Sequence, residues 1–238
     1  MMDKTEGGKG SFPGAAVNAG VNAAVMGRLK IAVPKGSLYS QSVEVLGRAG
    51  LDTSGLQNPG RQLVIRTDEA EFFIVRPTDV PVFVSYGGVD CAICGKDSLE
   101  EAALEVVELV DLDFGACRFV VAEPAFAGGA ADDAYSRLGI LRVATKYPRI
   151  TSRYYDSVGV QVELIKMHGN IELAPLCGMA DRIVDITATG TTLRENDLVV
   201  VDEVLRSTAR FVGNPASVRT DARVRNLAVE LERIRACV

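Results

Sequence analysis

The stretch from Arg182 to Asn196 most constrains the fold, because a short apolar run there meets a turn of small hydroxyl residues. The run 183–186 is typical of a buried strand and contains one carboxylate, Asp185. After the turn, Thr192 and Glu195 have the spacing of a capping box, which predicts the start of a helix. A strand, a turn and a helix start in this order indicate an α/β architecture.

The same turn can bind an anion. It consists of Thr187, Ala188, Thr189, Gly190, Thr191 and Thr192. The unpaired amides at a helix start carry about half a positive charge and favour a phosphate. Asp185 cannot bind phosphate but can accept hydrogen bonds from sugar hydroxyls, so together they fit a ribose phosphate. An ordinary capped strand–turn–helix is the alternative, and these residues alone leave both open.

Bulk composition narrows the class of protein. The 238 residues allow one large domain or two small ones, and 47% hydrophobic with 24% charged residues is ordinary for a soluble globular protein. A net charge of −5 argues against nucleic acid or an anionic membrane surface as the main partner. No apolar run approaches the roughly 18 residues of a membrane helix. Five scattered cysteines argue against a disulfide framework, so we expect a cytoplasmic protein.

Residues 1–26 are rich in Gly, Ala and Asn and almost lack large apolar side chains. Such a segment buries too little surface to offset its ordering entropy, which predicts a flexible extension. Lys4 and Lys9 precede a mildly apolar stretch, as in a signal peptide. Polar and glycine residues interrupt that stretch and acidic residues offset the lysines, so we reject a signal peptide.

From Leu29 onward, strand patterns alternate with helix patterns, which predicts a mixed but largely parallel sheet. Strands are expected at 29–33, 62–66, 71–75, 89–94, 106–111, 118–122, 141–145, 160–166, 182–187, 198–204 and 209–212. Helices are expected at 37–49 (capped by Ser37), 77–86, after 97, near 150–157 and 171–176, and at 218–235, with a loop at 128–133. Two clusters of such units place a ligand cleft between two lobes, at strand carboxyl ends.

The cysteines and the histidine predict no chemistry of their own. Cys91 and Cys94 spell C-x-x-C, but residues three apart on a strand point to opposite faces, so we expect core packing rather than a metal or redox site. His168 is the only histidine, and no G-x-S-x-G motif accompanies it. We expect it to lie in a loop at a strand end.

Cations follow two of the predicted strands. Lys35-Gly36 comes after the first strand and Gly95-Lys96-Asp97 after the fourth, which suits polyphosphate binding; solvated lysines are the alternative. Arg61 and Arg66 add positive charge to the same region. In Arg76-Pro77-Thr78-Asp79 a cation and a carboxylate share a rigid turn, which also fits a structural ion pair.

From Leu29 to Asn214 the chain resembles the short form of ATP phosphoribosyltransferase, the family of the first enzyme of histidine biosynthesis. Seven motifs in compatible order carry the resemblance and make it specific. They are residues 31–36 (IAVPKG), 76–81 (RPTDVP), 90–97 (DCAICGKD), 144–148 (ATKYP), 169–175 (GNIELAP), 180–185 (ADRIVD) and 189–193 (TGTTL).

The resemblance implies a two-lobe α/β fold of the type II periplasmic-binding-protein kind, with a cleft between lobes. Lobe I, on the nucleotide side, would comprise 27–112 and 205–238, and lobe II would comprise 113–204. The family transfers ribose 5-phosphate from phosphoribosyl pyrophosphate (PRPP) to N1 of the adenine of ATP and releases pyrophosphate. It requires Mg²⁺, which we expect to bind through PRPP with no metal ligand from the protein.

The resemblance also assigns residues. It places the PRPP 5′-phosphate on the Thr187–Thr192 turn, with Asp185 near the ribose hydroxyls. It gives Arg61 the catalytic contact to the departing pyrophosphate. The residues implied on the nucleotide side are Lys35, Gly36, Arg76, Asp79, Gly95, Lys96 and Asp97.

Two departures and a partner follow from the same comparison. Many short-form members have arginine where this chain has Ser37, and Gly169-Asn170 replaces a more usual Gly-Ser. Because little sequence follows Arg235, we expect no C-terminal regulatory domain. A regulatory subunit resembling histidyl-tRNA synthetase is expected instead, with a homodimer inside the hetero-oligomer. The alternatives are another PRPP-dependent transferase and a non-catalytic two-lobe ligand-binding module.

Overall fold

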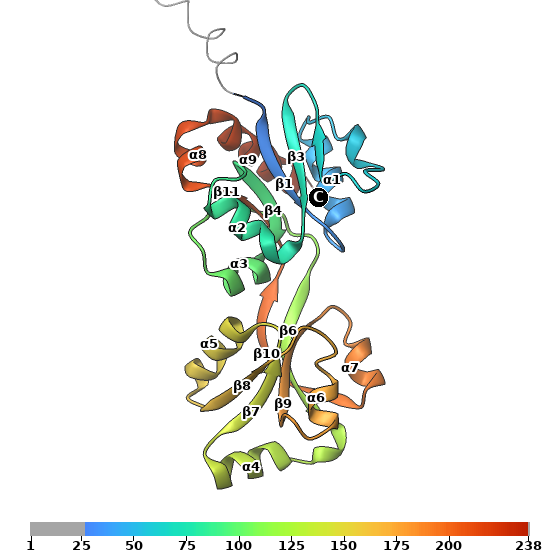
Figure 1. Ribbon diagram of the computed structural model, residues 1–238, viewed down its shortest axis with the longest axis vertical. Coiled ribbons are helices and arrows are strands. Elements are labelled where there is room, and N and C mark those ends of the chain that lie inside the picture. Colours follow the sequence, from blue (N-terminus) through green and yellow to red (C-terminus); the bar gives the residue numbers. More distant parts are fainter. Residues whose placement is uncertain (1–26, 238) are drawn as a thin grey trace, which may run out of the picture.

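The computed structural model describes residues 27–237, so the extension predicted at 1–26 lies outside the described residues. Two lobes, each with its own sheet, are joined by two antiparallel crossing segments (Figure 1). The strand order is β2-β3-β1-β4-β11-β5 in lobe I and β10-β6-β9-β7-β8 in lobe II. The predicted two-lobe α/β fold is confirmed.

Lobe I holds the ends of the described chain. Its strands are β1 (Leu29–Pro34), β2 (Val64–Arg66), β3 (Ala70–Val75), β4 (Cys91–Gly95), β5 (Val107–Asp111) and β11 (Ala209–Gly213). Its helices are α1 (Tyr39–Arg48), α2 (Val80–Ser85), α3 (Lys96–Ala102), α8 (Pro215–Thr220) and α9 (Ala222–Arg235), with 3₁₀ turns η1 (Ser54–Leu56) and η2 (Pro77–Asp79). Strand β1 runs parallel to β3 and β4, whereas β2, β11 and β5 pair antiparallel.

Lobe II is built in the same manner. Its strands are β6 (Cys117–Pro124), β7 (Leu141–Thr145), β8 (Val162–Lys166), β9 (Arg182–Thr187) and β10 (Leu198–Ser207). Its helices are α4 (Ala130–Leu138), α5 (Pro148–Val158), α6 (Leu173–Leu176) and α7 (Thr191–Glu195), with the 3₁₀ turn η3 (Ala125–Ala127). Strand β7 is parallel to β8 and β9, whereas β6 pairs antiparallel with β9 and β10.

The expectation of a largely parallel sheet is wrong. Antiparallel pairs link β6 to β9 and β10, β11 to β4 and β5, and β2 to β3, so each sheet has at least as many antiparallel as parallel pairs. The reason is the connection between lobes. Strands β10 and β11 return the chain from lobe II to lobe I alongside β6 and β5, so each returning strand runs against its outgoing neighbour.

Both faces of the lobe I sheet are buried, which explains the two strand cysteines. Cys91 packs with Phe72 and Phe211 on one face, whereas Cys94 packs with Val80 and Val212 on the other. Both thiols are free and buried. The prediction of core packing on opposite faces is confirmed.

Within the described residues, no helix combines the length and apolarity needed to cross a bilayer.

The loop predicted at 128–133 and the single helix predicted at 218–235 are both wrong. The loop expected at 128–133 contains the start of α4, because Gly128 and Gly129 take left-handed conformations (φ 51° and 90°) that turn the chain directly into the helix. The single helix expected at 218–235 is two helices. Asp221 is extended (φ −106°, ψ 110°) between them and caps α9 by accepting a hydrogen bond from the Arg223 amide at 2.8 Å.

The crossing segments form a two-strand hinge, which we define as residues 112–116 and Thr208. The Leu112 amide donates to the Ala209 carbonyl and the Ala209 amide donates to the Phe114 carbonyl, both at 2.9 Å. The first predicted lobe boundary, after 112, falls in this hinge. The second, before 205, falls inside β10, which pairs with β6 as far as Ser207.

Asp221→Asn should weaken the acid sensitivity of folding. Hydrogen bonds from the Arg223 side chain lower the pKa of Asp221 against an opposing effect of burial, and the two side chains lie 2.7 Å apart. A depressed folded pKa contributes stability above the unfolded value of about 3.9, and this contribution is lost as the pH falls through the folded pKa. Urea unfolding between about pH 5 and 2 should therefore show a shallower loss of stability in the variant.

Asp68→Asn is the matched control, because Asp68 is exposed and has no hydrogen bond or ion pair with another residue in 27–237. It should leave the acid dependence unchanged. A parent-like slope in Asp221→Asn would contradict the role given to the Asp221–Arg223 pair.

Candidate functional site

A cavity of about 530 Å³ lies between the lobes, where strand carboxyl ends from both sheets meet. Lobe I contributes Ser37, Gly95 and Asp97 to its lining, and lobe II contributes Tyr147 and the start of the predicted phosphate turn, Thr187 and Ala188. This is the cleft position expected for a two-lobe α/β protein.

The hydroxyl-rich turn connects β9 to α7 through its own side chains. Thr187 Oγ1 accepts the Gly190 amide at 2.8 Å, and the Thr189 and Thr191 hydroxyls lie 2.9 Å apart. The predicted capping box is wrong, because Gly190 (φ 72°) is the N-cap and α7 begins at Thr191 without a side-chain cap. Helix α7 has only five residues, so Glu195 lies at its end rather than in its first turn.

The turn is open to solvent. Ala188, Thr189, Thr191 and Thr192 are exposed, and only Gly190 is buried. Within residues 27–237, the amides of Ala188 and Thr189 donate no hydrogen bond. The amides needed for an anion are therefore not taken up by neighbouring protein groups.

Arg194 adds a positive charge that the sequence analysis did not assign. Its guanidinium donates to the Thr189 carbonyl at 3.0 Å and to Thr191 Oγ1 at 3.1 Å. The arginine lies one turn into α7, so its side chain folds back along the helix onto the turn. Its position three residues after Thr191 is the signal that could have identified it.

Asp185 is 8% exposed and lies on β9, two residues before Thr187. Burial raises the pKa of its carboxyl, while the Ile186 amide, which donates to Oδ1 at 2.8 Å, and Lys146 oppose the shift. Lys146 Nζ lies 3.9 Å from Asp185 Oδ2. This leaves a partly desolvated acceptor next to the hydroxyl-rich turn.

The β7–α5 turn also faces the cleft, and no residue of it was assigned from the sequence. Tyr147 lines both the larger cavity and a smaller one of about 260 Å³, which Lys146 and His168 also line. The Tyr147 ring packs edge-on against Phe119, with centroids 4.7 Å apart, and its amide donates to the buried Thr145 hydroxyl at 3.0 Å. The sequence signal that could have identified this turn is Lys146-Tyr147, which lies between the end of a predicted strand and a proline that starts a helix.

The first nucleotide-side turn follows β1 as predicted. Lys35 and Gly36 are exposed, and Gly36 takes a left-handed φ of 86° where an added Cβ would meet open space. Ser37 lines the larger cavity but does not cap α1, which begins at Tyr39. The chain therefore presents the Ser37 hydroxyl to the larger cavity.

The second nucleotide-side turn is divided between the cleft and the protein. Gly95 and Asp97 line the larger cavity, whereas Lys96 Nζ is 2.9 Å from Glu100 Oε1 and also pairs with Glu108. Lys96 is thus neutralised by lobe I rather than left for a ligand. A Cβ on Gly95 would lie 2.1 Å from Asp97 Oδ1, so a larger residue there would displace the Asp97 side chain.

Arg76, Asp79 and Arg61 are exposed at the same edge of the sheet, outside the cavity lining. No ion pair joins Arg76 to Asp79 among the described residues, so the structural-pair alternative finds no support. Arg61 precedes β2, whose start lies beside the carboxyl end of β3 through the Ile74 amide and the Leu63 carbonyl at 2.8 Å.

The loop after β8 contains the remaining predicted positions. His168 is exposed, as expected for a loop residue at a strand end. Asn170 adopts a left-handed φ of 49°, a conformation that asparagine tolerates better than serine. The Gly-Asn departure therefore fits the local backbone.

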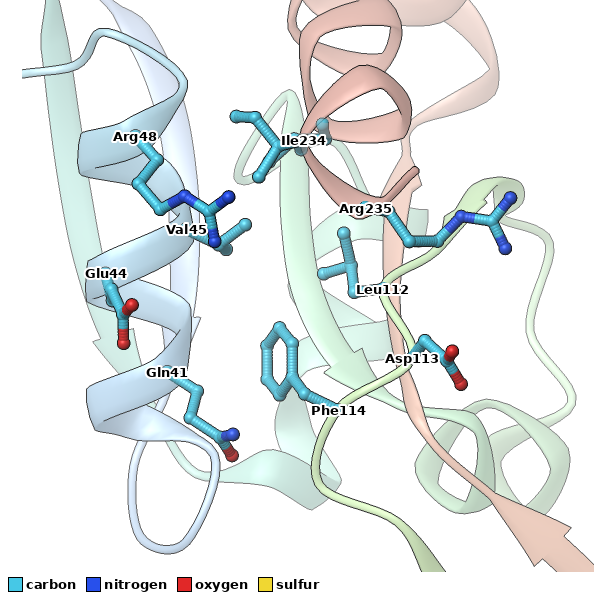
Figure 2. Close-up of a pocket in the computed structure, with 10 residues that line it drawn as sticks. Gln41, Glu44, Val45, Arg48, Leu112, Asp113, Phe114, Ile234 and Arg235 are labelled. Atoms are coloured by element: carbon cyan, nitrogen blue, oxygen red, sulfur yellow. The ribbon is translucent and has the colours of Figure 1, made fainter. Parts of the chain in front are cut away.

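Another cavity, of about 390 Å³, lies in lobe I between α1, the hinge and the end of α9. Figure 2 shows its apolar floor, including Phe114 and Ile234, with Arg48, Glu44 and Asp113 around it. Its charges are of both signs, and no residue assigned from the sequence lines it. The interlobe cleft is therefore the better candidate site.

The chain is similar in sequence to known proteins over most of its length. The family profile described as ATP phosphoribosyltransferase matches residues 76–233. The ATP phosphoribosyltransferase of Rubrobacter xylanophilus is 48% identical over 206 residues, 86% of this chain and 95% of the relative. That of Moorella thermoacetica is 47% identical, covering 85% and 90%.

Solved structures support both fold and family. The ATP phosphoribosyl transferase (HisG:HisZ) complex from Thermotoga maritima contains a chain with TM-score 0.73 and 32% identity, covering 88% of this chain and all of that one. The glutamate-bound GluR0 ligand-binding core, at 10% identity and TM-score 0.54, covers 90% and 94% and shows the fold alone. The chain belongs to the ATP phosphoribosyltransferase family, whose reaction is the first step of histidine biosynthesis.

Proposed function

We propose that the interlobe cleft is the active site, and that it joins PRPP and ATP from opposite lobes. The open turn at 187–192 carries the proposal, because its exposed hydroxyls and unused amides lie where the lobe II sheet meets the cavity. Across the cavity, lobe I presents Ser37, Gly95 and Asp97. One lobe thus offers an anion site and the other a nucleotide surface.

The PRPP phosphate binds the turn in this proposal. The Ala188 and Thr189 amides and the threonine hydroxyls donate to phosphate oxygens, and Arg194 adds a charge close to them. Asp185 accepts hydrogen bonds from the ribose hydroxyls. Its neighbour Lys146 favours the ionised carboxylate that this role needs.

The transfer needs positioning more than acid–base chemistry. The lone pair of adenine N1 forms a bond to C1 of the ribose, while the bond from C1 to the pyrophosphate oxygen breaks and the leaving group keeps the electron pair. Adenine N1 is unprotonated at neutral pH, so no general base is required. Holding the two substrates in line supplies on the order of 7–11 kcal/mol of the barrier reduction.

The nucleotide-side residues have two roles in this scheme. Lys35 and Arg76, exposed at the carboxyl ends of β1 and β3, attract the polyphosphate, while Gly36 permits close backbone approach. Asp79 and Asp97 are acceptors for sugar hydroxyls or for the adenine amino group. Lys96 is the weakest of the proposed contacts, because Glu100 and Glu108 already bind it.

We propose that Mg²⁺ enters with PRPP. Among residues 27–237, no three or more His, Cys, Asp or Glu side chains gather into a group that could hold a metal ion. We expect the ion to be held chiefly by substrate oxygens, with Asp185 or Asp97 near it. When bound, the ion supplies Lewis-acid stabilisation of the pyrophosphate.

We also propose a regulatory partner. The similar chain from Thermotoga maritima occurs in a HisG:HisZ complex, and this chain covers its whole length. A subunit resembling histidyl-tRNA synthetase would provide histidine feedback, with a homodimer of this chain inside the hetero-oligomer.

The five free cysteines fit a reducing, cytoplasmic compartment. Nucleic acid and membranes have no place in the proposal.

The decisive test is the reaction itself. Purified chain with ATP, PRPP and Mg²⁺ should form phosphoribosyl-ATP, followed by absorbance, whereas orotate or free purine bases should give no product. Adding the regulatory subunit should make the rate sensitive to histidine. Turnover of another acceptor in place of ATP would refute the proposed substrate.

Arg61→Ala should lower kcat by about 100- to 1,000-fold and change the KM for ATP less. The contact strengthens as charge grows on pyrophosphate, and one such donor is worth about 3–4 kcal/mol in a fully formed site. Arg66→Ala is the control, because Arg66 lies at the opposite end of β2 and pairs with Glu71 at 2.8 Å. Unchanged turnover in Arg61→Ala would remove the residue from the mechanism.

Gly190→Val should weaken PRPP binding at least about 10-fold, measured by calorimetry. A β-branched residue at φ 72° is strained, and the new Cβ would lie 3.3 Å from Arg194 Nη1. Gly190→Asn separates the causes, because asparagine accepts the left-handed conformation and should retain more affinity. Parent-like affinity in Gly190→Val would exclude the turn from the PRPP site.

A further inference from the structure

The lobes also touch away from the hinge, where α3 of lobe I meets α5 of lobe II (Figure 1). The Glu101 carboxylate accepts the Arg149 amide at 3.1 and 3.2 Å and the Ile150 amide at 3.0 Å. Beside it, Arg153 Nη1 lies 2.6 Å from Glu100 Oε2. A carboxylate of one lobe thus binds the first turn of a helix in the other.

Helix α5 depends on that carboxylate because it has no cap of its own. Its N-cap residue, Tyr147, makes no side-chain cap hydrogen bond, and Pro148 at the first helical position has no N–H. The next two amides, Arg149 and Ile150, point out of the positive end of the helix, and Glu101 satisfies both. The contact is therefore specific in geometry as well as in charge.

The capped turn carries groups of the proposed active site. Lys146 and Tyr147 come directly before α5 and line the smaller interlobe cavity together with Glu101. Tyr147 lines the larger cavity too, and Lys146 lies 3.9 Å from the Asp185 carboxylate. Glu101 consequently fixes the position of these groups relative to the nucleotide-side lobe.

We propose that Glu101 is a positioning residue for phosphoribosyl transfer, which holds α5 against lobe I at the separation where both substrates meet. The proposal rests on the placement of the active site in the cleft. Glu101 acts through the Arg149 and Ile150 amides and not on the reacting atoms. Without it, a smaller fraction of the molecules holds the binding-competent arrangement. The apparent affinity for the substrates falls in proportion to that fraction.

The test compares three variants of the full chain under conditions in which the parent is active. Glu101→Ala should raise the KM for ATP and for PRPP about 10-fold. Its kcat should fall less than about 3-fold, because bound substrates restore the binding-competent arrangement. Glu101→Gln keeps an oxygen acceptor for the amides and should stay within about 3-fold of the parent. Glu105→Ala is the control, because Glu105 is exposed and has no hydrogen bond or ion pair within 27–237.

Hydrogen exchange at the Arg149 and Ile150 amides reports on the contact itself. It should accelerate in Glu101→Ala, remain near the parent rate in Glu101→Gln, and be unaffected in Glu105→Ala. Accelerated exchange with parent-like KM values would overturn the positioning role and leave a structural cap. Unchanged exchange would overturn the contact. A parent chain that makes no phosphoribosyl-ATP refutes the proposed function first, and the positioning role with it.

Discussion

The hydrogen bonds of the hinge are the constraint on which the rest of the structure depends. The Leu112 amide donates to the Ala209 carbonyl and the Ala209 amide donates to the Phe114 carbonyl, which joins the two crossing segments into one ribbon. Two connections allow the lobes to bend about a line but oppose free rotation. The strand ends of both sheets therefore keep facing one another across the same cavity.

Some cations near the cleft are paired with carboxylates of the protein, and others are exposed to solvent. Lys96 and Arg210 are paired with the carboxylates of β5, while Lys35 and Arg76 are exposed at neighbouring strand ends. Arg194 folds onto the phosphate turn in lobe II. A protein of net charge −5 thus leaves these cations exposed at strand ends and on the 187–192 turn.

Local sequence patterns predicted the strands and turns, because the conformation of a short apolar run or of a glycine turn is determined by residues close together in the chain. They placed Lys35, Gly36 and the 187–192 turn at strand ends. They could not show that Lys96 is neutralised by Glu108, since that pair depends on how β5 joins the sheet. The cap that Glu101 gives to α5 spans 49 positions and two lobes. The capping box at Thr192 misled because Gly190 already turns the chain.

The position of β11 has a consequence for how the chain acquires its shape during synthesis. Lobe II is complete once Ser207 has emerged from the ribosome, because all its strands lie between β6 and β10. In lobe I, β11 lies between β4 and β5, so β5 has no neighbour until residues 209–213 appear. Lobe II can therefore fold first, while the lobe I sheet stays incomplete until β11 has been made.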